Sequence, residues 1–205
     1  MRRWIVVLAV VVLGMAGMVA AQGQGRGRET APGQQNRTAP GVADPKPSPG
    51  AGAIIVFETV KGTFEVETYP NEAPKSVEHI LTLARRNFYN GLRVHRLVRG
   101  QLVQFGDPQS RDMSKRDSWG TRGSGKTIGV AEMNPKRKHL VGSVALAHSG
   151  DPRFADSQLY VMLIPQPKYD KNYTVIGRVI AGMDVVQKLQ ETDIIRRATV
   201  REARK

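Results

Sequence analysis

Two side chains able to donate hydrogen bonds interrupt an apolar alternation within residues 94–108. Side chains alternate between the two faces of a sheet, which predicts Arg96 on one face and its neighbour His95 on the other. The alternation resumes after a glycine, and Gln104 is predicted to share a face with Leu102. Arg96 and Gln104 would then lie on one sheet surface among apolar neighbours, as fixed donors on a rigid support. That arrangement suits the holding of a peptide carbonyl.

Strand-like runs and two helix patterns must position that segment. The first helix is predicted from about residue 74 to 86, because Pro74 suits the first helical turn and apolar residues follow with a 3.6-residue period. A second helix is predicted to begin near Asp184. Many short strands with two helices predict a mainly β fold, a closed antiparallel barrel capped by two α-helices, and not alternating parallel βα units. The other strand-like runs are residues 54–60, 63–69, 128–131, 142–147, 157–164, 174–180 and 194–200.

The first 50 residues differ in composition from the rest. A cationic start, an apolar run and small residues up to Ala21 are typical of a secretory signal peptide over residues 1–21, with cleavage after Ala21. An uncleaved anchor is the alternative, since about 18 apolar residues can just span a bilayer. Residues 22–50 are rich in Pro, Gly and Gln and nearly devoid of apolar side chains, which predicts a disordered linker. Residues 51–205 are then the folded domain, exported to the periplasm or secreted.

The chain is strongly basic, with a formal net charge of +13, and it contains no cysteine. Its Lys and Arg residues are scattered, without a basic stripe interleaved with aromatic side chains, so no nucleic-acid partner is expected. A solvated basic surface is the favoured interpretation, and docking on an anionic membrane or polymer is the alternative. The absence of cysteine excludes disulfides, thiolate metal sites and a cysteine nucleophile.

Residues 120–127 match the phosphate-loop pattern G-x-x-x-x-G-K-[ST] at every position. That site needs a buried strand entering the loop and a helix leaving it, so that amides and the helix dipole cradle phosphate. The preceding residues in this chain are mostly polar, and Asn134-Pro135 opposes a helix afterwards. We therefore expect a glycine-rich surface loop without a nucleotide.

The other reactive side chains lack the spacing of known catalytic or metal sites. The histidines show no metal-ligand spacing, and His79 and His139 are expected to be exposed. Ser157 has no G-x-S-x-G elbow around it. Asp107 and Asp151 each precede a proline and are predicted to be turn residues. No metal and no cofactor are expected.

Five segments share their residue types and order with one protein family. They are VHRLV to QFGD (94–98 and 104–107), PNEAPKSVE (70–78), GSVALA (142–147), DSQLY (156–160) and YTVIGRVIAGMDVV (173–186). Together they resemble the cyclophilin family of peptidyl-prolyl cis-trans isomerases, over essentially all of residues 53–200. The resemblance implies an eight-stranded antiparallel barrel with two capping helices, and an outer groove that holds an extended peptide with its proline in an apolar pocket.

The resemblance also implies roles for individual residues. Arg96 matches the family arginine and is the expected catalytic residue, a cation that stabilises the twisted prolyl amide. Gln104 matches a glutamine that orients the peptide and the arginine, and Leu102 matches a wall of the proline pocket. The other positions expected to bind substrate are His95, Gln101, Ala147, His148, Gln158, Leu159, Tyr160, Lys168, Tyr169 and Tyr173.

The chain departs from the family pattern at the pocket wall. Gln101 stands where well-known members have an aromatic residue, and a Leu-Tyr pair follows Gln158 where Phe-Phe is usual. Tyr173 replaces a histidine, and Lys168 or Tyr169, depending on the gap chosen, takes the place of an aromatic residue. These changes predict slower or differently selective isomerisation and weak binding of cyclosporin-type inhibitors.

Two functions are compatible with these residues. The first is an exported isomerase that accelerates X-Pro rotation in proteins folding outside the cytoplasm, acting as a monomer on proline-containing segments. The alternative is a peptide-binding, chaperone-like module on the same barrel with little or no catalysis. Apart from its signal segment, no contact of the chain with a membrane is expected.

Overall fold

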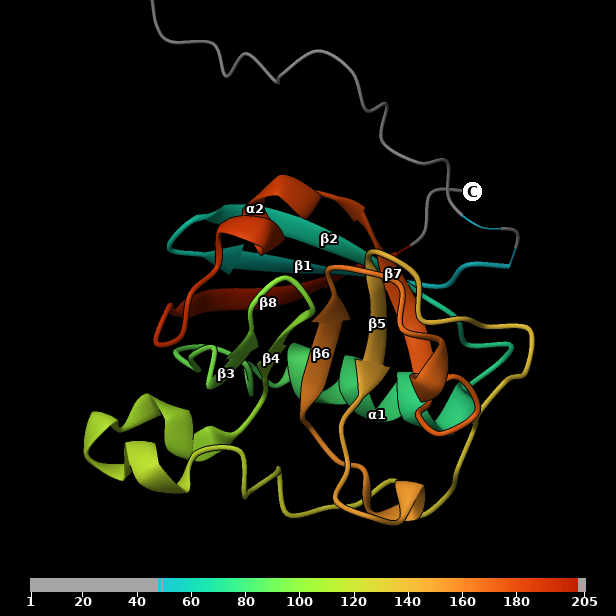
Figure 1. Cartoon of the computed structure of the whole chain (residues 1–205), viewed down its shortest axis with the longest axis horizontal. Coiled ribbons are helices and arrows are strands. Elements are labelled where there is room, and N and C mark those ends of the chain that lie inside the picture. Colours follow the sequence, from blue (N-terminus) through green and yellow to red (C-terminus); the bar gives the residue numbers. More distant parts are fainter. Residues whose placement is uncertain (1–47, 49, 203–205) are drawn as a thin grey trace, which may run out of the picture. The chain divides into compact units, whose positions relative to one another are not determined.

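Eight antiparallel strands form one sheet in the computed structural model, which describes Ser48 and residues 50–202 (Figure 1). Their spatial order is β3-β4-β6-β5-β7-β2-β1-β8. The predicted mainly β, antiparallel architecture is confirmed. The strands are β1 (Ile54–Thr59), β2 (Gly62–Thr68), β3 (Arg96–Val98), β4 (Leu102–Phe105), β5 (Ser143–Leu146), β6 (Leu159–Met162), β7 (Val175–Ala181) and β8 (Ile195–Arg201).

The sheet is an open half-barrel, and the prediction of a closed barrel was wrong. Strands β3 and β8 lie at the two ends of the strand order and share no ladder of hydrogen bonds. The segments just before them meet instead, through one isolated bridge between Arg93 and Ile194 and a 2.9 Å bond from Val94 N to Asp193 O. Strand β3 is only three residues long and begins at Arg96, three residues after the bridge at Arg93. The bridge therefore does not continue into a ladder.

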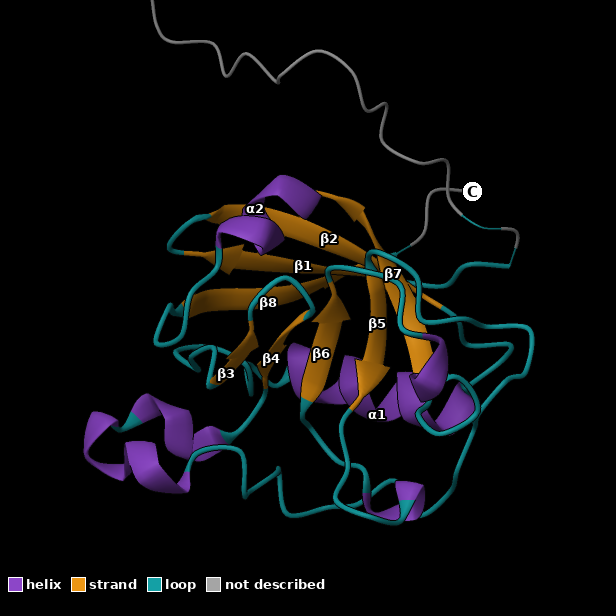
Figure 2. Cartoon of the chain, in the orientation of Figure 1, coloured by secondary structure: helices purple, strands orange, loops and turns teal. Residues whose placement is uncertain are grey.

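Two α-helices accompany the sheet, as predicted. Helix α1 (Pro74–Arg85) contacts β8, and α2 (Met183–Lys188) contacts β2; in Figure 1 α2 lies at the top of the domain and α1 lower down. Proline at the start of α1 needs no amide partner, and Gly182 before α2 adopts φ 75°, a left-handed conformation that costs glycine little. Figure 2 shows a further helical lobe, formed by the 3₁₀ helices η1 (Pro108–Arg111) and η2 (Met113–Ser118).

The sheet buries apolar side chains on both faces. The larger cluster joins the concave face to α1 and contains an aromatic group in which Phe57 and Phe64 stack with ring centroids 5.0 Å apart. Phe105 meets Phe57 edge-on at 5.3 Å. A smaller cluster on the other face is built around Leu102 and Tyr160. This second cluster lies on the face that carries Arg96 and Gln104.

Several sequence-based expectations fall outside the described residues or differ from the structure. The predicted signal peptide lies outside the described residues, as does the predicted linker apart from Ser48 and Gly50. Residues 128–131 do not form the predicted strand, because Gly129 turns to φ 78° and leaves the extended region. Within the described part of the chain, no helix is long and apolar enough to cross a membrane.

Candidate active site

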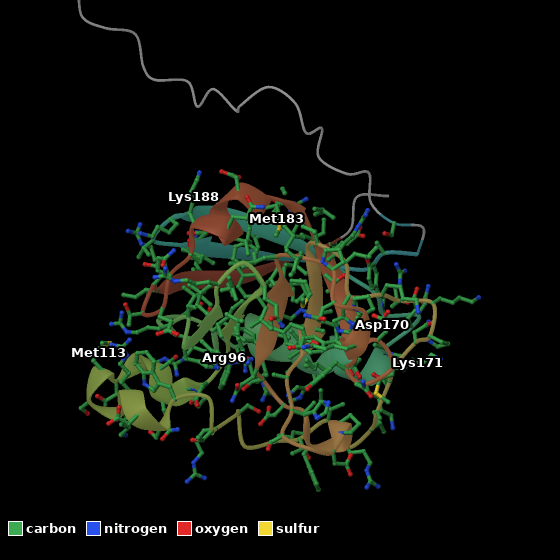
Figure 3. All side chains as sticks on the ribbon, in the orientation of Figure 1. Arg96, Met113, Asp170, Lys171, Met183 and Lys188 are labelled. Carbon is green, nitrogen blue, oxygen red and sulfur yellow. The ribbon has the colours of Figure 1, made fainter. Side chains whose placement is uncertain are left out.

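The β3–β4 hairpin places Arg96 directly opposite Gln104. The Arg96 Nη1 atom donates to Gln104 Oε1 at 2.9 Å, so the predicted shared face is confirmed. Arg96 is exposed, whereas Gln104 is only 8% exposed. A buried amide therefore holds a guanidinium that projects towards solvent. Figure 3 shows Arg96 between the sheet and the helical lobe that carries Met113.

A chain of side-chain amides extends from this pair. Gln104 Nε2 donates to Gln158 Oε1 at 2.9 Å, and Gln158 Nε2 donates to the carbonyl oxygens of Gly120 and Arg122 at 2.9 and 2.8 Å. His95 Nε2 lies 3.1 Å from the same Gln158 oxygen, which accepts, so Nε2 carries the proton. Gln158, which is itself held by His95 and a loop, thus fixes the orientation of the Gln104 amide that holds Arg96.

His95 lies on the same cavity as Arg96, which corrects the prediction that the two occupy opposite faces. The alternation rule applies within a regular strand, and β3 begins only at residue 96. Burial lowers the pKa of His95 below the ordinary histidine value, and the nearby Asp107 carboxylate opposes this only in part. His95 is therefore a neutral ring at physiological pH.

A cavity of about 350 Å³ opens beside Arg96. Aromatic rings and two apolar side chains, Leu102 and Ala147, form part of its lining, and arginine, glutamine and histidine side chains add polar groups. Small binding sites usually combine apolar walls with a few such polar groups. Its lining residues are His95, Arg96, Leu102, Gln104, Trp119, Gly120, Ala147, His148, Tyr160, Tyr169 and Tyr173.

Tyr160 at the floor of this cavity is fixed by a buried histidine. His139 Nδ1 lies 3.1 Å from Asp170 Oδ1 and therefore donates to it, which leaves Nε2 to accept from the Tyr160 hydroxyl at 2.9 Å. The expectation that His139 is exposed was wrong, since it is 1% exposed. Burial lowers the pKa of His139 despite the Asp170 carboxylate, and burial raises the pKa of Tyr160.

Four residues predicted to bind substrate do not line the cavity. Leu159 is fully buried in the concave core, because strand alternation turns it away from the face that carries its neighbour Tyr160. Gln101 supports the wall from behind, with Nε2 donating to the Tyr169 hydroxyl at 2.9 Å. Lys168 lines a neighbouring hollow. Gln158 also stands behind the lining, where it holds Gln104.

Trp119 and Gly120 line the cavity, although sequence reasoning did not assign them to it. They begin the glycine-rich loop, whose amides are occupied by the protein's own carboxylates. Asp107 Oδ2 accepts from the amides of Gly120 and Arg122 at 2.7 and 3.1 Å. A phosphate would have to displace this carboxylate, which agrees with the expectation of a loop without a nucleotide. The glycines of the motif are the one feature of the sequence that could have indicated a loop backbone lying close to the site.

A second carboxylate, Asp156, holds the far end of the loop. It accepts from the Ser124 hydroxyl at 2.5 Å and from the Gly125 amide at 3.0 Å. His79 Nε2 lies 3.0 Å from the same carboxylate, so His79 is half-buried and paired where exposure was expected. Burial tends to raise the pKa of Asp156, but the hydrogen bonds from His79 and Ser124 outweigh it and lower that pKa.

Among the described residues, no group of three or more His, Cys, Asp or Glu side chains is placed to hold a metal ion. The arrangement can instead hold an apolar ring in the cavity and present a permanent cation to the polar group attached to it.

Comparison with known proteins agrees with this geometry. The family model described as cyclophilin type peptidyl-prolyl cis-trans isomerase/CLD matches residues 54–204. The peptidyl-prolyl cis-trans isomerase-like 1 of Aspergillus niger is 36% identical over 136 residues, covering 66% of this chain and 80% of the relative. The peptidyl-prolyl cis-trans isomerase of Helicobacter pylori is 32% identical over 145 residues, covering 70% of this chain and 83% of the relative.

Solved structures share the fold. The crystal structure of a Cryptosporidium parvum cyclophilin superposes with a TM-score of 0.64 at 20% identity, covering 75% of this chain and 99% of that one. A second structure of that cyclophilin, in the presence of the dipeptide Ala-Pro, gives a TM-score of 0.63 at 19% identity, with 73% and 99% covered. The chain belongs to the cyclophilin-type peptidyl-prolyl cis-trans isomerases, and isomerisation of prolyl peptide bonds is its activity.

Proposed function

We propose that the cavity beside Arg96 holds the proline ring of a substrate and that Arg96 is the catalytic residue. The observation that carries this is the exposed guanidinium held by a buried amide beside a cavity that three tyrosines, Leu102 and Ala147 help to line. The crystal structure of the Cryptosporidium parvum cyclophilin in the presence of the dipeptide Ala-Pro supports the proposal that the ligand contains proline. The remaining lining residues, including Ala147 and His148, then contact the ring and the adjacent backbone.

The proposed mechanism is electrostatic. Resonance in the prolyl amide creates a barrier of about 18–20 kcal/mol to rotation, while its cis and trans forms differ by only about 0.5–1 kcal/mol. Twisting the bond localises the nitrogen lone pair, and a cation beside that nitrogen stabilises the twisted state more than the planar one. Arg96 supplies this cation. The hydrogen bond to Gln104 already holds its planar guanidinium in place, so the side chain has little reorganisation to undergo during the reaction.

The cellular setting is also part of the proposal. We place the enzyme outside the cytoplasm, as a monomer that acts on proline-containing segments of folding proteins. The composition of residues 1–21 and of the linker over residues 22–50, followed by a folded domain over residues 51–205, supports this. Weak binding of cyclosporin-type inhibitors also remains a proposal, supported by Gln101 and by three tyrosines in the pocket wall.

A protease-coupled isomerisation assay with proline-containing peptides tests the role of Arg96. We expect Arg96→Ala to lower kcat/KM by about 10²-fold to 10³-fold, the cost of removing one preorganised group from a charge-stabilising site. Arg99→Ala is the matched control, since Arg99 is also exposed in the same hairpin but does not line the cavity. Equal rates for Arg96→Ala and the unmodified protein would refute the catalytic assignment. Peptide binding without any isomerisation would favour the chaperone-like alternative.

A further inference from the structure

A second hollow, of about 540 Å³, adjoins the cavity beside Arg96. The two hollows share three lining residues, His148, Tyr169 and Tyr173. A polypeptide whose proline occupies the first cavity therefore passes close to the second. Its remaining lining residues are Met133, Gly150, Pro152, Lys168, Lys171 and Asn172.

Two cations of this hollow have no acidic partner. Among the described residues, no carboxylate oxygen lies within 4.0 Å of the ammonium groups of Lys168 and Lys171. The two acidic residues next to lining residues have other partners: Asp170 lies 3.6 Å from Lys138 and also binds His139, and Asp151 pairs with Arg153 at 2.6 Å. The hollow thus presents two uncompensated positive charges above an aromatic wall.

Lys171 occupies a position where a side chain is unfavourable. Its φ of 63° lies in the left-handed region, which glycine adopts freely and a residue with a Cβ does not. The loop is nevertheless braced, since Asn172 Nδ2 donates to Lys168 O at 2.9 Å and His148 Nε2 donates to Asn172 O at 3.0 Å. Backbone strain of this kind is concentrated at functional positions, and here it holds a lysine at the rim of a hollow.

We propose that this second hollow binds an acidic side chain of the substrate, close in sequence to the proline. The inference rests on the proposed function, because it assumes that the cavity beside Arg96 holds the proline. An extended chain advances about 3.3 Å per residue, so the shared walls place the acidic residue within about three positions of the proline. Lys168 and Lys171 are then specificity-determining residues that favour acidic sequences over neutral or basic ones.

Matched peptides provide the test. A set carries Glu, Gln or Lys at each of the three positions on either side of one proline, and kcat/KM is measured with the full chain at low and high salt. At one position we expect Glu to be preferred over Gln by about 2-fold to 10-fold at low salt, the size typical of exposed charge pairs. The preference should fall with added salt and should disappear in the double variant Lys168→Gln, Lys171→Gln.

Lys188→Gln is the matched control. It removes one positive charge from α2, half of what the double variant removes, and Figure 3 shows Lys188 and Lys171 at opposite sides of the described domain. This variant should keep the full Glu preference, and Lys171→Arg should keep it as well. A loss in Lys188→Gln of about half that in the double variant, in proportion to the charge removed, would mean that only net charge matters and would overturn the proposal.

The outcomes separate this inference from the proposed function. Isomerisation of every peptide with equal kcat/KM overturns the acidic subsite and leaves the isomerase assignment intact. If no peptide is isomerised, fluorescence anisotropy of the same labelled peptides decides the question. Tighter binding of the Glu peptide, lost in the double variant, supports the subsite, whereas equal affinities reject it.

Discussion

Strands β4 and β6 present two different surfaces from the same eight residues. Towards the core they place Val103, Phe105, Leu159 and Val161, all buried in the large apolar cluster. Towards the candidate site they place Leu102, Gln104, Tyr160 and Met162, where amide and hydroxyl groups accompany the apolar ones. The paired register, with Gln104 opposite Tyr160 and Phe105 opposite Leu159, keeps each set on its own face.

The difference shows how one element can serve both stability and chemistry. The core face gains its stability from area removed from water and from close packing, which do not depend on direction. The site face depends on directed hydrogen bonds, because a buried donor or acceptor left without a partner costs free energy. Substitutions on the two faces should therefore have separable effects, and three measurements test this separation.

Phe105→Ala should have the largest effect on the free energy of unfolding. Phe105 is 1% exposed and packs edge-on against Phe57, so truncation leaves a cavity that costs about 3–5 kcal/mol. Urea denaturation measures the loss. The folded fraction of this variant should isomerise peptides with kcat/KM near that of the unmodified chain. A large fall in kcat/KM would show that the two faces are not independent.

Gln104→Ala should affect kcat/KM more than the free energy of unfolding, the reverse of Phe105→Ala. It removes the hydrogen bond to the Arg96 guanidinium, and bonds to charged groups contribute about 1.5–3 kcal/mol, so kcat/KM should fall by about 10-fold to 100-fold. Urea denaturation should show a loss smaller than that of Phe105→Ala. Val103→Ala, on the core face of the same strand, is the control and should keep its kcat/KM. Unchanged activity in Gln104→Ala would remove the basis for a preorganised arginine.

The smallest expected effect is on the pH dependence of the free energy of unfolding, and it arises from the side of the sheet that carries the site. Burial lowers the pKa of His139, so the folded state disfavours the protonated ring, while the unfolded chain protonates near about pH 6.5. Below that pH the unfolded state binds more protons, and the free energy of unfolding should fall as pH drops from 7.5 to 5.5. One group contributes at most about 1.4 kcal/mol per pH unit.

Urea denaturation at the two pH values checks this dependence. His139→Gln should lose less free energy of unfolding on acidification than the unmodified chain, because the variant lacks the ring that takes up a proton on unfolding. Val103→Ala should keep the original pH dependence, since it changes the core face only. An identical pH dependence in His139→Gln would place the effect in other groups, with His95 as the next to substitute because burial also lowers its pKa.

Features that depend on local pattern could be predicted from the amino-acid sequence. Alternation with period two put Arg96 and Gln104 on one face, and helical periodicity with Pro74 located α1. The order of the motifs identified the family. Turn chemistry identified Asp107 and Asp151 correctly, since each caps a 3₁₀ helix that begins with the proline after it. Apart from the motif order, which runs through most of the domain, these features follow from neighbours within a few residues along the chain.

Only the tertiary structure decided which distant groups meet. The open sheet follows from how far β3 extends, and the burial of His139 follows from contacts with Tyr160 and Asp170, which lie 21 and 31 residues away. Docking of the glycine-rich loop depends on Gln158, which lies more than 30 residues beyond it. Charge and motif patterns suggested exposure for His139 and a free surface for the loop, because burial depends on packing between segments that no local pattern records.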